Sequence, residues 1–206
     1  MEAVSGLRER KKQRTRDAIV EAAFELFAER GFDGTTVADI ADAAEIAPRT
    51  FFSYFPSKDD VVFHDFEQQY ALVSSWLSDR EPGVNTFDAL RTGIADNLAE
   101  LGKEGPDLER KRLRNTLVRQ NESLAAHSEY LHGKFAELVS ESVAEDLGDS
   151  PSDLRPRLVA AAMTAAMNVI DDLSEEDAAE HSQETFESLL AFLQGGLAAL
   201  QEQSSG

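Results

Sequence analysis

The chain has 206 residues, no cysteine and a formal net charge of −19. The lack of cysteine excludes disulfides and thiolate metal sites. The longest apolar run, Leu158 to Met167, is too short to cross a bilayer. The basic N-terminus also lacks the apolar stretch of a signal peptide. These features predict a cytoplasmic protein with no membrane partner, long enough for a small domain and a larger helical one.

The first predicted helix runs from about Arg14 to Arg30, and Gly31 suits its left-handed C-terminal cap. One apolar stripe marks it: Ile19, Ala23, Leu26 and Phe27. A basic arm precedes the stripe: Arg8, Arg10, Lys11, Lys12, Arg14 and Arg16. Such a run is either a solvated tail or a nucleic-acid contact, and its place beside the next motif favours the second.

Two short helices joined by a tight turn are predicted between residues 35 and 58. Thr36 suits the N-cap of the first, with Asp39 completing a capping box. Pro48 suits the first position of the second helix, which is expected to reach Tyr54. Ser57 is then expected to cap a further helix. This pattern is a helix-turn-helix, a shape that fits the DNA major groove.

The order of these segments resembles the N-terminal domain of the TetR family of bacterial transcriptional repressors. The resemblance covers about residues 13–62 and rests on FAERGFDGTTV, IADAAEIAPRTFFSYF and PSKDDVV. It implies an all-α fold, with a DNA-binding head over residues 1–57 and a ligand-binding and dimerisation domain over residues 58–206. The fragment PRTFFSYFPSK also resembles a subgroup in which some members respond to acyl-CoA-type ligands.

The resemblance, with the outward positions of the second helix, predicts the residues that contact DNA. Arg49 can bond guanine O6 and N7, and helix N-termini favour phosphate. Phe52 stands where the family usually has a phosphate-contacting tyrosine, so its expected role is packing, against a thymine methyl or a sugar. Glu45 and Ala47 also depart from the usual glycine and hydroxyl residue. The predicted DNA-binding set is Arg14, Thr36, Arg49, Thr50, Phe52, Ser53, Tyr54 and Lys58.

The rest of the chain is predicted to be helical throughout. The expected helices cover about residues 58–77, 86–101 (capped by Thr86), 107–120, 128–147, 154–173 and 183–200. A short turn is expected at 123–127, breaks at 102–106 and 148–152, and an acidic, mobile connection at 174–182. The last two helices have wide apolar faces, which indicates a homodimer interface; an ordinary monomer core is the alternative.

The resemblance further implies an apolar pocket for a small hydrophobic effector, with no cofactor or metal. The candidate residues are Phe66, Tyr70, Trp76, Asn115, Arg119, Met163, Met167 and Asn168, with Leu98, Leu117 and Thr164 beside them. Arg119 could bind a carboxylate or phosphate, or form a surface ion pair. Effector binding would change the separation of two recognition helices. That separation must match one duplex turn of about 34 Å, unless two dimers share one site.

The sequence gives less support to other classes of protein. The four histidines are scattered without metal-ligand spacing, and no phosphate-binding loop, dinucleotide fingerprint or nucleophile elbow is present, so an enzyme is not expected. A helical interaction or ligand-sensing protein without operator binding and a transcriptional activator remain open. The acidic net charge opposes DNA binding, but no Lys or Arg follows Arg157, and charge far from the duplex is screened beyond about 8 Å.

Overall fold

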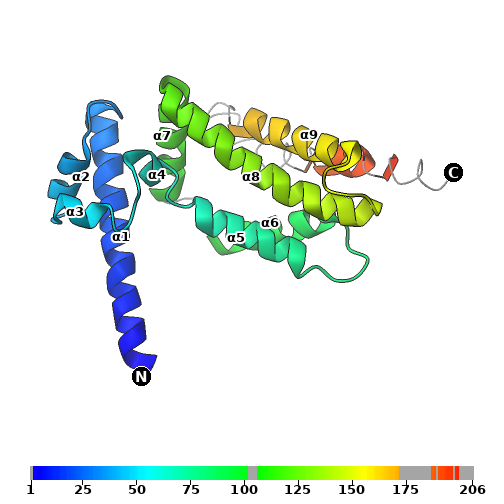
Figure 1. The fold of residues 1–206 in the computed structure, drawn as a ribbon, viewed down its shortest axis with the longest axis horizontal. Coiled ribbons are helices and arrows are strands. Elements are labelled where there is room, and N and C mark those ends of the chain that lie inside the picture. The colour runs from blue at the N-terminus through cyan, green and yellow to red at the C-terminus, as the bar shows by residue number, and fades with distance from the viewer. Residues whose placement is uncertain (1, 102–105, 172–186, 189, 197, 200–206) are drawn as a thin grey trace. The chain divides into compact units, whose positions relative to one another are not determined.

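The structure, a computed structural model, describes residues 2–101, 106–171, 187–188, 190–196 and 198–199 (Figure 1). Within those residues the regular structure is helical, which confirms the predicted all-α class. The helices are α1 (Glu2–Arg30), α2 (Val37–Ala43), α3 (Pro48–Phe51), α4 (Lys58–Val62), α5 (Phe66–Ser78), α6 (Thr86–Leu101), α7 (Pro106–Gln120), α8 (Glu122–Leu147) and α9 (Leu154–Asp171). None of the described helices combines the length and apolar character that a membrane span requires.

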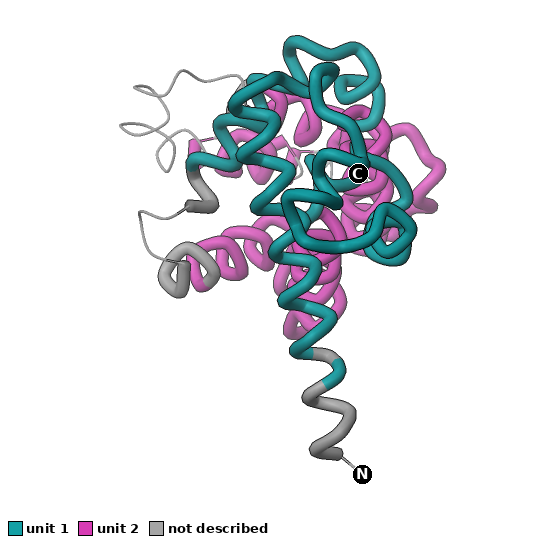
Figure 2. The backbone as a smooth tube through the Cα atoms, turned by 90° about the vertical axis from the view of Figure 1, so that its left-hand side faces the viewer, with its two compact units in different colours: residues 1–65, 106–127 teal, residues 66–105, 128–206 magenta. Residues whose placement is uncertain are grey.

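The chain forms two compact units, coloured separately in Figure 2. Unit 1 contains residues 1–65 and 106–127, and unit 2 contains residues 66–105 and 128–206. The expected division after residue 57 therefore differs from the structural one. The physical reason is that Leu117 of α7 and Leu124 of α8 are buried in the same core as Phe24 and Phe27 of α1.

Unit 1 packs α1, α2, α3 and α4 around a core of phenylalanines. Phe27, Phe51 and Phe55 are almost fully buried there. Gly31 ends α1 with a φ of 73°, the left-handed conformation predicted for its cap. The capping box at α2 is also confirmed, because the Asp39 amide donates to Thr36 Oγ1 (3.1 Å) and the Thr36 amide donates to Asp39 Oδ2 (2.9 Å).

Two predicted helix boundaries near α1 and α4 are wrong. The helix expected from Arg14 begins at Glu2, so the basic arm is part of α1. The helix expected over residues 58–77 is two helices, with a turn at residues 63–65. The carbonyl of His64 in this turn accepts a hydrogen bond from the Arg16 guanidinium (2.5 Å), a long-range partner that the local apolar pattern could not reveal.

Two further predictions fail at the caps of α6 and α8. Asn85, not Thr86, caps α6, because its Oδ1 accepts from the amides of Phe87 and Asp88 (both 3.0 Å). The turn expected at residues 123–127 is instead the first part of α8. Asn121 caps this helix by accepting from the amide of Ser123 (3.0 Å). In both places the side-chain oxygen of an asparagine accepts hydrogen bonds from N–H groups that the first helical turn leaves without a partner.

Unit 2 buries a second core between α5, α6, α8, α9 and the segment that contains Leu190 and Leu193. Gly93 of α6 lies so close to Trp76 of α5 that a Cβ atom added there would come within 2.1 Å of the indole. The break after α8 is confirmed, with Gly148 at a φ of 69°. The predicted helix over residues 183–200 is helical where it is described. The predicted connection at 174–182 lies outside the described residues, as does the predicted break at 102–106 except for Pro106, which begins α7.

Candidate DNA-binding surface

The turn before α3 determines how this short helix is presented. Glu45 has a φ of 54°, the left-handed conformation that favours glycine, which accounts for a glycine being usual at this position in the family. Pro48 occupies the first turn of α3, as predicted, and Ala47 supplies no side-chain cap. Phe51 and Phe55 anchor α3 and the turn after it in the core of unit 1.

Three residues of this segment are exposed and share one face. Arg49, Phe52 and Ser53 are exposed, and their spacing of i, i+3 and i+4 places them on the same side of the helical turns. Thr50 and Tyr54 are half-buried, and Tyr54 packs against the core of unit 1. The surface that α3 offers to a major groove is therefore centred on Arg49, Phe52 and Ser53 rather than on Tyr54.

Arg16 is not one of the exposed cations of the basic run, although the sequence-based interpretation placed it in a basic arm that contacts nucleic acid. Its guanidinium donates to the carbonyls of Tyr54 (3.4 Å) and His64 (2.5 Å) and lies 4.3 Å from the centre of the Phe55 ring. Burial lowers the pKa of the Arg16 guanidinium, partly offset by the nearby Asp17 carboxylate. Arg16 thus positions the end of the α3 segment, a role that its place in a basic run concealed.

Lys58 has a similar internal role at the start of α4. Its Nζ donates to the carbonyls of Phe32 (2.6 Å) and Thr35 (2.9 Å), and it lies 3.9 Å from the centre of the Phe32 ring. The ammonium therefore caps carbonyls of the loop between α1 and α2. Its predicted contact with DNA stays a prediction, with two of the three ammonium protons already engaged.

The N-terminus of α2 already holds an anion. Asp39 Oδ2 accepts from the amide (2.9 Å) and the hydroxyl (2.5 Å) of Thr36, and these hydrogen bonds lower the pKa of the Asp39 carboxyl. A phosphate approaching Thr36 would meet this carboxylate. The basic residues of α1 are better placed for phosphate, since Arg8, Arg10, Lys11, Lys12 and Arg14 are all exposed.

His64 lies in the turn between α4 and α5, with its Nδ1 buried and without a hydrogen-bond partner. Its ring packs edge-on against Phe24, with the ring centres 5.6 Å apart. Burial lowers the pKa of the imidazole, and Arg114, Arg110 and Arg16 lower it further against the opposing effect of Asp65. Arg114 also pairs with Asp65 (3.0 Å), which ties α7 to the same turn.

The presentation of α3 on a three-helix core can be compared with known proteins. Residues 19–64 match the profile of bacterial regulatory proteins of the tetR family, and residues 84–200 match that of the MftR C-terminal domain. The chain belongs to the TetR family. This TetR-family protein is 33% identical to the transcriptional regulator TcmR of Streptomyces glaucescens, over 80% of this chain and 75% of that protein.

Two further comparisons, one of sequence and one of fold, are consistent with this family. The transcriptional regulator MftR of Mycobacterium tuberculosis is 32% identical, over 73% of this chain and 75% of that protein. The fold resembles SmeT in its complex with triclosan, with a TM-score of 0.60 and 19% identity over 86% of this chain and 90% of that one. This TetR-family protein is accordingly a DNA-binding transcriptional regulator, and its helix-turn-helix is the site at which it binds.

The predicted effector-binding residues of the regulator are divided between its two units. Asn115 and Arg119 lie on α7 in unit 1, where Arg119 is exposed and donates to Thr116 Oγ1 (3.4 Å). The others lie in unit 2: Phe66, Tyr70, Trp76, Met163, Met167 and Asn168. Of these, Phe66 and Tyr70 stand with Phe135 in one aromatic cluster, Trp76 and Met163 pack against the core, and Asn168 is exposed.

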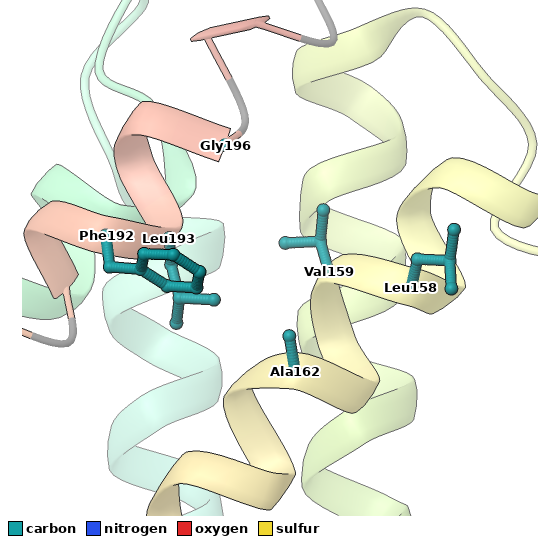
Figure 3. A pocket seen from close by; sticks show the side chains of 6 residues that line it. All are labelled: Leu158, Val159, Ala162, Phe192, Leu193 and Gly196. Atoms are coloured by element: carbon teal, nitrogen blue, oxygen red, sulfur yellow. The ribbon is translucent and has the colours of Figure 1, made fainter.

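Two surface hollows of unit 2 contain none of these candidates. An apolar groove of about 280 Å³ lies between α9 and the segment after residue 186, as Figure 3 shows. Its lining is Leu158, Val159, Ala162, Phe192, Leu193 and Gly196. A polar hollow of about 430 Å³ lies beside Arg80, which donates to Thr86 Oγ1 (3.1 Å) and pairs with Asp146 (3.3 Å). Among the residues described, no cluster of three metal-ligating side chains occurs.

Proposed function

We propose that this TetR-family regulator is a homodimeric repressor of a palindromic operator, released when a small hydrophobic effector binds. The observation that carries the DNA-binding part is the exposed face of Arg49, Phe52 and Ser53 on a segment anchored by Phe51 and Phe55. A recognition helix reads base edges only if its outward side chains are free while its inward ones fix its position. Both conditions hold for α3.

The dimer is supported by the apolar surface at the end of the chain. Leu158 and Phe192, which line the groove of Figure 3, are 55% and 75% exposed, and Leu154 of α9 is 67% exposed. Large apolar side chains gathered on one surface are typical of a subunit interface. A second copy would cover them and would bring a second recognition helix to the other half of a palindrome.

A hydrophobic effector is supported by the relationship to proteins such as SmeT, whose solved structure holds triclosan. An acyl-type effector follows only from the resemblance of PRTFFSYFPSK. Native mass spectrometry of the regulator purified from its host should detect a retained small molecule. We also propose a cytoplasmic location, beside the chromosome, with no enzymatic activity and no cofactor.

Operator binding is tested with the promoter region of the regulator's own gene in a fluorescence-anisotropy titration. We expect moderate affinity that falls steeply as the salt concentration rises. Arg49→Ala should cost about 1–3 kcal/mol on the operator and much less on random duplex, because base contacts and not phosphate contacts are lost. An equal loss on both duplexes would assign Arg49 to phosphate. No binding at any salt concentration, with selection from a random library also failing, would favour a helical interaction protein.

An in vitro transcription assay on the bound promoter distinguishes a repressor from an activator. Occupancy by a repressor lowers the transcript level, and addition of the effector restores it. A rise in transcript on protein binding would identify an activator instead.

A further inference from the structure

We infer that Phe52 is a specificity-determining residue that reads the C5-methyl group of a thymine in each half of the operator. This inference rests on DNA binding by the helix-turn-helix. It assigns to the reading surface an apolar contact in addition to the hydrogen bonds expected from Arg49.

The first support is the position of Phe52. Its side chain is 56% exposed, although the neighbouring Phe51 and Phe55 are buried at 0% and 2% exposure. A single exposed apolar residue on a protein surface is ordinary and needs no explanation. Phe52, however, lies between Arg49 and Ser53 on the exposed face of α3 and its following turn, which is the surface that a groove would cover.

The second support is that the ring is held in place before any DNA binds. The rings of Phe51 and Phe52 meet edge to face, with centres 5.4 Å apart and planes at 83°. Phe51 is itself fixed in the core of unit 1. The exposed ring therefore has a rigid support, and little side-chain freedom is lost when a partner covers it.

The third support is chemical. Phenylalanine has no donor or acceptor, so Phe52 cannot bond a phosphate oxygen or a polar base edge. The apolar group that a base pair offers in the major groove is the thymine methyl. Sugars lie along the phosphate backbone at the edges of the groove, whereas base edges form its floor, which the exposed face of a recognition helix meets. The central place of Phe52 beside Arg49 therefore favours a base over a sugar.

The test uses the full-length protein and a duplex that it selects from a random library. Each thymine of the selected duplex is replaced in turn by uracil, which removes the methyl group and leaves the base-pairing edge unchanged. At one position of each half-site, we expect uracil to weaken binding about fourfold, the value of one buried methyl group. Replacement in both half-sites should weaken binding about fifteenfold. Replacing a cytosine elsewhere by 5-methylcytosine should have no such effect.

Variants test whether the sensitivity to the thymine methyl group comes from the Phe52 side chain. Phe52→Ala should bind the thymine duplex at least as weakly as the wild type binds the uracil duplex, with no further loss on uracil. Phe52→Tyr should keep the methyl sensitivity, because its ring remains. Ser53→Ala is the matched control on the same face and should also keep it. Circular dichroism checks that each variant is folded, which the exposure of Phe52 leads us to expect.

Two results would overturn the inference. One is wild-type binding that is indifferent to uracil at every position, and the other is methyl sensitivity that survives in Phe52→Ala. Failure of the wild type to select any duplex would instead contradict DNA binding itself, so the two failures are distinguishable.

Discussion

At the scale of single residues, the structure separates cations that look alike in the sequence. Arg14 and Arg16 are two positions apart in one basic run, yet Arg14 is exposed and Arg16 is half-buried with two backbone carbonyls as partners. A position two residues further along a helix faces a different side. The sequence predicted a basic arm ahead of the first helix, but not that the arm is helical or that Arg16 would cap the α3 segment.

This difference gives a matched pair of variants. Arg16→Gln should lower the free energy of unfolding by about 1–3 kcal/mol, because hydrogen bonds from a charged group are lost. Its operator binding, measured where the variant is folded, should keep the wild-type salt dependence. Arg14→Gln should do the reverse, with stability changed by less than about 0.5 kcal/mol and the slope of log K against log salt reduced by about 0.9 per phosphate contact. Urea denaturation and anisotropy titrations measure the two quantities, and identical behaviour of the pair would contradict this assignment.

His64 should make stability depend on pH. Burial and the neighbouring arginines lower the pKa of its imidazole, so the unfolded chain takes up a proton that the folded protein resists. As pH falls below about 6.5, the unfolded state binds more protons, and the free energy of unfolding falls by at most about 1.4 kcal/mol per pH unit from this group. Above about pH 6.5 the contribution is constant.

The measurement is a series of urea titrations between pH 5 and pH 8. His64→Phe should flatten the slope and keep the contact with the Phe24 ring, since the Nδ1 atom has no partner to lose. His132→Gln, a change on α8, is the control and should leave the contribution of His64 in place. A slope unchanged in His64→Phe would show that other groups cause the pH dependence.

At the scale of helices, sequence patterns predicted those helix boundaries best that neighbouring residues determine. The cap of α2 by Thr36, the start of α3 at Pro48 and the end of α1 at Gly31 depend on neighbouring residues, and all three were predicted correctly. The break at residues 63–65 was missed; there the His64 carbonyl accepts a hydrogen bond from Arg16, which lies 48 positions earlier. Apolar periodicity continues across that break, so no local signal separates α4 from α5.

The contact between α5 and α6 supports a prediction that reverses a general rule. Replacing a mid-helix glycine by alanine usually stabilises a helix by up to about 1 kcal/mol. Gly93→Ala should instead lower the free energy of unfolding by about 1–3 kcal/mol, because the new methyl would overlap the Trp76 indole. Gly133→Ala on α8, where a Cβ atom would meet nothing within 4 Å, should follow the rule. Thermal denaturation followed by circular dichroism tests both signs, and stabilisation of Gly93→Ala would show that this packing is looser than the structure indicates.

At the scale of the whole molecule, a protein of net charge −19 has to bind a polyanion. The charge is unevenly distributed, with exposed cations on α1 and no Lys or Arg after Arg157. The family resemblance predicted that the N-terminal segment binds DNA, because the caps and the turn of a helix-turn-helix can be recognised in the sequence. The effector site had no such signal. Aromatic and methionine residues at helical spacing occur in any core, and the structure places most of the described candidates in packed clusters.

The dimer should depend on the apolar surface of α9 and the segment after residue 186. Leu158→Asp with Phe192→Asp places two carboxylates where a second copy would bury apolar side chains, and burying an unpaired charge costs several kcal/mol. We expect the mass by light scattering to fall from that of two chains to that of one chain of 22.6 kDa. Tyr130→Asp, at a residue of α8 that is 64% exposed, adds the same charge and should remain a dimer.

The same variant links assembly to DNA binding. In a dimer, binding of one recognition helix holds the second at a high local concentration beside the other half-site. The monomeric variant should therefore lose its preference for a palindrome over a single half-site, while its affinity for the half-site is unchanged because Arg49 and Phe52 are intact. A variant that stays dimeric, or a monomer that still prefers the palindrome, would show that the last helices do not join the subunits.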